Sequence, residues 1–167
     1  ALELLEKCLL EDKQILIVGD FDADGATASA VAIKALRLMG AKHVDFLVPN
    51  RFKHGYGLSP EIVKEAKRDK EPDLIITVDN GISSNEGAEL ARSLDIDVII
   101  TDHHLPPNEL PNANAIINPN LRGCDFPSKN LAGVGVCFYL FSSLKTYLTK
   151  QGYFEKNNIQ NPDLRTL

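Results

Sequence analysis

The sequence predicts an α/β fold, with a mostly parallel sheet of five strands and helices on both of its faces. Short apolar runs of strand length, rich in β-branched residues, alternate with segments of helix length. These runs are apolar at nearly every position, which is typical of parallel strands that are covered on both faces. Three of the runs end at an aspartate, and this pattern bears on function as well as on fold.

The elements follow one another along the chain with few interruptions. Strands are expected at 14–19, 43–48, 73–78, 97–101 and 114–118, and helices at 25–39, 60–69, 84–94 and about 131–149. Ser59 is a candidate N-cap with Pro60 at the first helical position. Ser83 and Glu86 fit a capping box at the start of the next helix. We expect one domain over residues 1–150, followed by a linker and the start of a further helix over 151–167.

Composition limits the classes of function. The chain of 167 residues is 44% hydrophobic and 25% charged, as in ordinary globular proteins. No apolar run approaches the roughly 20 residues that cross a bilayer, so no membrane partner is expected. The acidic segment 1–13 lacks the basic start and the apolar centre of a signal peptide.

Charge and cysteine content bear on partners and compartment. The net charge of −5 argues against nucleic acid as a partner, unless bound cations neutralise some carboxylates. The three cysteines, Cys8, Cys124 and Cys137, are far apart in the sequence and form no CxxC motif. They are expected to be packing residues of a protein in a reducing compartment. We therefore expect a cytoplasmic protein.

Acidic residues follow three of the expected strands directly. They are Asp20, Asp22 and Asp24 after the first strand, Asp79 after the third, and Asp102 with His103 and His104 after the fourth. In an open parallel sheet, ligands bind beyond the carboxyl ends of the strands, so these side chains are expected to meet there. Without a counter-charge, such packing would cost several kcal/mol or force protonation. A pair of divalent ions about 3.5–4 Å apart would turn the repulsion into binding.

The histidines narrow the choice of metal. Carboxylates alone suit Mg²⁺ or Ca²⁺, whereas imidazole beside them shifts the preference toward Mn²⁺ or a similar ion. Two such ions can activate a water and hold the oxygens of a phosphoryl group during in-line displacement. The sequence therefore favours a Mn²⁺ or Mg²⁺ site that hydrolyses phosphoesters.

Each acidic cluster taken alone has a simpler explanation. Asp79 could cap the following helix, and DFDADG begins like a calcium-binding loop but lacks the glutamate at its twelfth position. A dinucleotide-binding fold would need glycines where the first strand ends, and this chain has aspartates there. The recurrence of acidic residues at three strand ends favours the metal site.

The motifs GDFDADG, VDNG and TDHH, in this order and spacing, resemble the first three motifs of the DHH phosphoesterase superfamily. The stretches VPNRFKHGYGLSP and AIINPNLRGCDFPSKNLAGVGVCFYL resemble the single-stranded-DNA exonucleases of that superfamily. The resemblance implies a metal-dependent, processive 5′→3′ exonuclease that releases 5′-mononucleotides in recombination and DNA repair. It implies single-stranded DNA as the substrate, with single-strand-binding protein and helicases as partners. A pyrophosphatase, a phosphodiesterase of oligonucleotides or cyclic dinucleotides, and a non-catalytic DNA-binding module remain alternatives.

The resemblance also implies roles for individual residues. The expected catalytic set is Asp22, Asp24, Asp79, Asp102, His103 and His104, and the expected metal set is Asp20, Asp22, Asp24, Asp79 and His103. Asp20 and Asp102 would act as ligands or as residues that orient ligands. Arg51, Asn80 and His104 would contact the substrate, with His104 facing the scissile phosphate.

Four further expectations concern particular positions and the region beyond Leu167. Many family members have a histidine where this chain has Val18, so one metal ion would take water or Asp20 instead. The aspartate of the fourth motif is expected beyond Leu167, and so is the family's second domain. Tyr56 is expected to pack under its loop, with base stacking as the alternative. Gly133 and Gly135 are expected to permit close helix–sheet packing.

Overall fold

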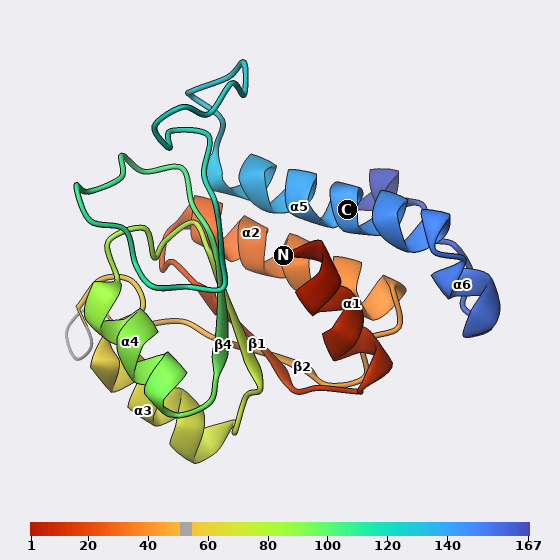
Figure 1. The fold of residues 1–167 in the computed structure, drawn as a ribbon, viewed down its shortest axis with the longest axis horizontal. Coiled ribbons are helices and arrows are strands. Elements are labelled where there is room, and N and C mark those ends of the chain that lie inside the picture. The colour runs from red at the N-terminus through yellow and green to blue at the C-terminus, as the bar shows by residue number, and fades with distance from the viewer. Residues whose placement is uncertain (51–54) are drawn as a thin grey trace.

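The computed structural model describes residues 1–50 and 55–167, and these residues form an all-parallel sheet of five strands (Figure 1). The strands are β1 (Ile15–Gly19), β2 (Val44–Leu47), β3 (Leu74–Val78), β4 (Asp97–Thr101) and β5 (Ala115–Ile117). The spatial order is β2-β1-β3-β4-β5, so the chain leaves β1 toward β2 and then returns to β3 on the other side. The fold class predicted from the sequence is confirmed.

Helices cover both faces of the sheet. They are α1 (Leu2–Leu10), α2 (Ala23–Leu38), α3 (Pro60–Asp69), α4 (Asn85–Ser93), α5 (Gly133–Lys150) and α6 (Tyr153–Lys156), followed by the 3₁₀ helix η1 (Leu164–Thr166). Helices α1, α2 and α5 pack on one face, and α3 and α4 pack on the other (Figure 1). Alternate strand residues pack into the two cores on opposite faces of the sheet. Ile15 and Ile17 pack against α1, α2 and α5, whereas Leu16 and Val18 pack on the face covered by α3 and α4.

Strand register determines where the functional residues emerge. Gly19, the last residue of β1, is paired with Val78, the last residue of β3. Val78 is paired in turn with Thr101, the last residue of β4. The residues that directly follow β1, β3 and β4 therefore leave the sheet side by side at its carboxyl edge. This edge contains the crevice between β1 and β3, where the order of the strands reverses direction and where open α/β sheets bind ligands.

One predicted helix start is confirmed and the other is wrong. Ser59 caps α3 by accepting a hydrogen bond from the Ile62 N–H. The capping box of Ser83 and Glu86 does not form, because α4 begins one residue later, with Ser84 as its N-cap residue. The Ser84 hydroxyl instead accepts a hydrogen bond from the Leu58 N–H and so ties α4 to the residue before Ser59.

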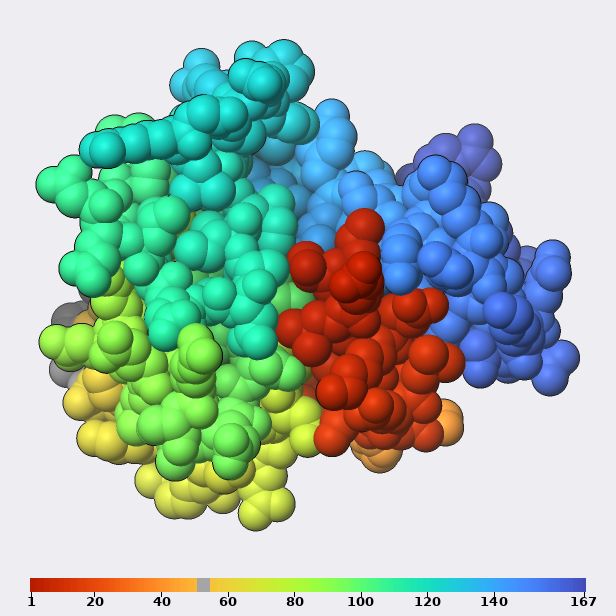
Figure 2. Space-filling view, viewed as in Figure 1, coloured from red at the N-terminus to blue at the C-terminus, as the bar shows by residue number. Residues whose placement is uncertain are grey.

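The segment after α5 differs from a free linker. Tyr153, Phe154 and Leu164 are buried and belong to the core beneath α1, α2 and α5. In contrast, the loop between β5 and α5 projects from the body of the molecule at the carboxyl edge of the sheet (Figures 1 and 2). Within the described residues, no helix combines the length and the apolar character needed to cross a bilayer.

Candidate metal centre

Three aspartates leave the sheet side by side at its carboxyl edge. Asp20, Asp79 and Asp102 follow β1, β3 and β4 directly, and all three are buried. Asp22 is the N-cap of α2, and its carboxylate accepts a hydrogen bond from the Gly25 N–H. The polypeptide therefore places acidic side chains from three strands and one helix start around a single crevice.

Among the described residues, two groups of side chains could each hold a cation, and they share one member. Carboxylate oxygens of Asp20, Asp22 and Asp79 all lie within 4.8 Å of one another. Asp79, His103 and His104 form the second group, with ligand atoms within the same distance. Asp79 therefore belongs to both groups and lies at the centre of the arrangement.

Asp79 is held in an unfavourable state in the absence of a cation. Its side chain is 2% exposed, and its backbone adopts a φ of +63° in the left-handed region. Among the described residues its Oδ1 atom has no hydrogen-bond partner. Burial, followed by the charges of Asp24 and Asp22, raises the pKa of Asp79 to about 7.

His103 presents a lone pair to Asp79. Its Nδ1 atom lies 2.9 Å from the Leu131 carbonyl oxygen, which can only accept, so Nδ1 carries the proton. In the neutral ring, Nε2 is then an acceptor, and it lies 3.2 Å from Asp79 Oδ1. Two acceptors facing each other at this distance need a cation or a proton between them. A backbone carbonyl behind the imidazole is the usual support of a metal-ligating histidine, so these residues fit a metal site.

Asp102 orients the histidine pair. Its Oδ1 atom accepts hydrogen bonds from the backbone N–H groups of His103 and His104 and from His104 Nδ1, the last at 2.7 Å. Its Oδ2 atom accepts the Ile82 N–H. These bonds use the carboxylate within the protein, which favours the orienting role over direct ligation. Burial lowers the pKa of His104, but the hydrogen bond and charge of Asp102 outweigh this effect and raise the pKa above its usual value.

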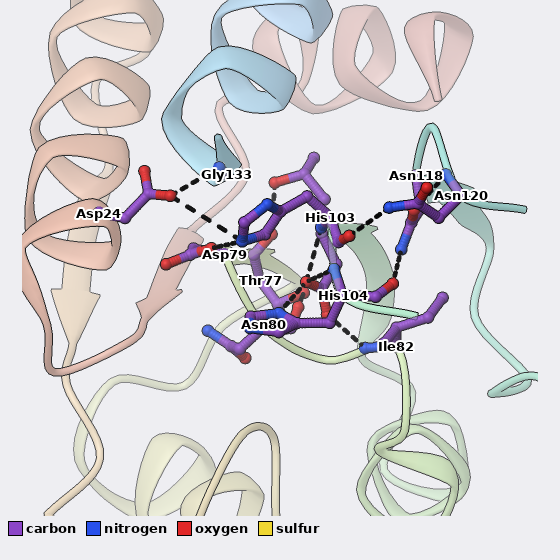
Figure 3. Close-up of polar contacts among 12 residues, drawn as sticks. Asp24, Thr77, Asp79, Asn80, Ile82, His103, His104, Asn118, Asn120 and Gly133 are labelled. Atoms are coloured by element: carbon purple, nitrogen blue, oxygen red, sulfur yellow. Dashed lines mark hydrogen bonds and ion pairs between the residues drawn. The ribbon is translucent and has the colours of Figure 1, made fainter. Parts of the chain in front are cut away.

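Asp24 joins the centre to the start of α5. One of its oxygens accepts the Gly133 N–H at 2.7 Å (Figure 3). The other accepts the Val134 N–H at 2.8 Å, at a helix start where the dipole favours a negative charge. Its Oδ2 atom is also 4.0 Å from His103 Nε2. Each carboxylate oxygen has a second lone pair, so these bonds leave Asp24 able to bind an ion.

Gly133 has a specific steric role at this point. A Cβ atom on this residue would lie 2.1 Å from Asp79 Oδ1, so no other amino acid fits without displacing the carboxylate. The close approach expected for Gly133 is therefore present, although its neighbour is the Asp79 carboxylate.

Two asparagines that the sequence analysis missed hold the backbone of the histidine pair. Asn118 Nδ2 donates to the His104 carbonyl at 2.9 Å, and Asn120 Nδ2 donates to the His103 carbonyl at 2.6 Å (Figure 3). The Asn118 Oδ1 atom accepts the backbone N–H of Asn120, which ties the Asn118 side chain to the Asn120 backbone. The available signal was their position: Asn118 directly follows the fifth strand, as aspartates directly follow β1, β3 and β4.

The expected substrate contacts have different outcomes. Arg51 falls within residues 51–54, which lie outside the described residues. Asn80 is fully buried, and its Nδ2 atom donates to the carbonyls of Val18 and Val78, so it braces β1 against β3. Because Asn80 has no exposed surface, its position does not offer the expected substrate contact. Tyr56 is 53% exposed, so the expectation that it packs under the loop is wrong.

A parallel α/β sheet with this set of aspartates and paired histidines at its carboxyl edge defines the class of protein. The N-terminal domain of the DHH family matches residues 14–164, and the chain belongs to the DHH family. The single-stranded-DNA-specific exonuclease RecJ of Escherichia coli (strain K12) is 58% identical over 167 residues, which are 100% of this chain and 29% of that protein.

Solved structures agree with this relationship. A crystal structure of exonuclease RecJ bound to manganese has a TM-score of 0.77 and 38% identity, and covers 88% of this chain and 37% of that chain. RecJ from Thermus thermophilus in complex with Mn²⁺ has a TM-score of 0.72 and 30% identity, and covers 96% of this chain and 21% of that chain. The chain thus spans less than a third of the length of the Escherichia coli relative.

Proposed function

We propose that the chain forms the metal-binding part of a 5′→3′ exonuclease that hydrolyses single-stranded DNA to 5′-mononucleotides. The observation that carries the proposal is the pair of facing acceptors, Asp79 Oδ1 and His103 Nε2, at the centre of the acidic crevice. The relatives that resemble the chain along its length are named as single-stranded-DNA-specific exonucleases, which favours DNA over pyrophosphate or cyclic dinucleotides.

Mn²⁺ or Mg²⁺ is the proposed cofactor, and the residues divide into two ligand groups. Asp20, Asp22 and Asp79 would hold one ion. Asp79 and His103, with Asp24 beside them, would hold the other. Val18 packs in the apolar core. Many relatives of the superfamily have a histidine at this position, so water or the nearby carboxylate of Asp20 would supply the missing ligand. When bound, two divalent ions lower the pKa of a water and stabilise the charge of the phosphoryl oxygens.

The remaining side chains act on protons and orientation. Asp102 holds His104 through Nδ1, which leaves Nε2 as the nitrogen able to meet the substrate on a side chain that is 48% exposed. Because Asp102 raises the pKa of His104, the protonated ring is more available near neutral pH as a donor to a phosphate oxygen or to the leaving oxygen. Asn118 and Asn120 keep the histidine backbone in place during this transfer.

The charge of the chain is compatible with this substrate only together with the ions. A net charge of −5 repels DNA, whereas two divalent ions add four positive charges at the crevice where cleavage is proposed. Polarity, processivity, a cytoplasmic location, and single-strand-binding protein and helicases as partners belong to the proposal through the resemblance to the exonucleases of the family. A fourth-motif aspartate and a second domain beyond Leu167 complete the proposed enzyme.

Calorimetry and a nuclease assay test the proposal together. Mn²⁺ is titrated into the full-length protein that contains this chain, and into its Asp79→Asn variant. Degradation of a 5′-labelled single-stranded oligonucleotide is followed in the same samples. We expect binding of about two ions per chain and release of 5′-mononucleotides, both lost in the variant. Asp69→Asn, at the exposed end of α3, is the matched control and should change neither result.

A further inference from the structure

Two aromatic side chains lie exposed beside the metal centre. Phe21, between Asp20 and Asp22, is 42% exposed, and Tyr56 is 53% exposed. Their rings meet edge to face, with centroids 6.4 Å apart and an interplanar angle of 82°. Large aromatic rings are normally buried, so a pair that remains in solvent at the rim of a reaction site needs an explanation.

The pair continues a row of rings that starts at the metal centre. The His103 and His104 centroids are 4.7 Å apart, and those of His104 and Tyr56 are 6.0 Å apart, both in edge-to-face geometry. The Tyr56 hydroxyl lies 3.5 Å from His104 Nδ1. The row therefore leads from a proposed ligand, through the proposed proton donor, to the partly exposed rings of Tyr56 and Phe21.

We infer that Tyr56 and Phe21 form a stacking platform for the nucleobase of the nucleotide next to the scissile phosphate. The inference rests on the proposed function, because it takes the phosphate to lie at the metal centre. A nucleotide held there by its phosphate must place its sugar and base away from the ions, and the row of rings offers the adjoining apolar surface.

The chemistry of the pair suits a nucleobase. Tyr56 and Phe21 present uncharged aromatic rings that are partly exposed. Every nucleobase has an uncharged face that can stack on an aromatic ring.

Substrates that lack one base test this inference in the full-length protein. Single-stranded oligonucleotides carry either a normal nucleotide or an abasic site at the first or the second position from the 5′ end. Their kcat and KM in Mn²⁺ are measured for the parent protein and for Tyr56→Ala, Tyr56→Phe and Phe21→Ala. Tyr139→Ala is the matched control, because Tyr139 on α5 is 52% exposed and makes an edge-to-face contact with another aromatic ring, that of Phe126.

We expect Tyr56→Ala and Phe21→Ala to raise KM for the normal oligonucleotide by roughly tenfold each, as for the loss of one base–aromatic stack. The effect should be similar for all four bases. With the abasic site at the stacked position, the parent protein and these variants should have the same KM. Tyr56→Phe should keep the preference for a base, and Tyr139→Ala should behave like the parent protein.

Two results would overturn the inference, and they differ from failure of the proposed function. If Tyr56→Ala and Phe21→Ala lose the same factor on normal and abasic substrates, the rings serve the structure of the site and do not bind a base. If the variants act on both substrates like the parent protein, the rings have no role in binding. A parent protein that cleaves neither oligonucleotide refutes the proposed function itself, and the platform with it.

Discussion

Acidic residues gather at both ends of the sheet, and the two ends differ in how their charges are satisfied. At the amino end, Asp73 accepts the Gln14 N–H and lies 3.3 Å from Lys13 Nζ, and Asp97 accepts an Asn114 amide hydrogen. At the carboxyl end, Asp79 is buried without a hydrogen-bond partner for Oδ1 among the described residues. The density of carboxylates alone therefore does not identify a metal site. The unsatisfied, desolvated carboxylate is the stronger indication of such a site, because its burial has to be offset by a bound cation or a proton.

The largest expected difference between the two ends is in metal-dependent activity. In the full-length protein, Asp79→Asn removes the shared carboxylate of both ligand groups and should reduce kcat/KM on single-stranded DNA by about a thousandfold or more, since a metal ion contributes several kcal/mol to the transition state. Asp73→Asn, at the opposite end, should leave kcat/KM nearly unchanged. Equal losses in the two variants would remove the distinction between the ends.

The same substitution should have the opposite effect on stability without metal. The folded-state pKa of Asp79 is raised from 3.8 to about 7, so the folded chain binds this proton more tightly than the unfolded chain does. Stability from this group is present below pH 3.8 and is lost as the pH rises through 7. Three pKa units correspond to roughly 4 kcal/mol. In a chelator, Asp79→Asn should therefore raise the free energy of unfolding by up to about that amount at pH 8, and by much less at pH 4.

Urea unfolding at both pH values measures this effect. Asparagine also tolerates the positive φ at this position, so the backbone does not oppose the change. Asp73→Asn should show no such gain at pH 8, because its carboxylate already has partners. Added Mn²⁺ should stabilise the parent chain and not Asp79→Asn. If Asp79→Asn lowers the free energy of unfolding at pH 8 in the presence of the chelator, the buried Asp79 carboxylate does not destabilise the metal-free fold.

Substitution of an asparagine at each end of the sheet, Asn118 or Asn114, should have effects of intermediate size. Asn118→Asp keeps the shape of the side chain but replaces its donor with an acceptor against the His104 carbonyl. We expect Mn²⁺ affinity or kcat to fall by about 10- to 100-fold, as for other groups that orient metal ligands. Asn114→Asp, which alters the bonds to the Val98 N–H and to Asp97, is the matched control at the other end. Calorimetry and single-turnover kinetics separate an effect on binding from one on the histidine pair.

The sequence predicted the strands and the position of the acidic crevice because both depend on local patterns. An apolar run long enough for a strand, ended by aspartate, identifies the edge of the sheet without knowledge of the partners. The contacts of Asp24 with the Gly133 and Val134 N–H groups join positions more than 100 residues apart, and no local pattern encodes them. Ser83 failed as a cap for the same reason: Leu58, distant in sequence, engages the neighbouring Ser84.

For Asn118 and Asn120, the local pattern gives only their place directly after the fifth strand and not their role. They lie where β5 gives way to an irregular loop without helical or strand periodicity, so the sequence offers no direction for their side chains. Only the path of that loop over the histidine pair turns two ordinary loop amides into its supports (Figure 3). Local periodicity thus predicts where a site lies, and tertiary contacts decide which residues hold it.

The smallest effect is expected from removing the Lys13–Asp73 ion pair at the amino end of the sheet. Lys13→Met removes the ammonium group beside Asp73 and leaves the Gln14 N–H in place at 2.8 Å. Both side chains of this pair are more than a third exposed, so water replaces much of the lost interaction. Mn²⁺ stoichiometry should stay unchanged, and kcat/KM should stay within about twofold of the parent value. A new Mn²⁺ site in this variant would show that an unpaired acidic cluster is sufficient for binding, and that desolvation at the carboxyl end is not what distinguishes the metal centre.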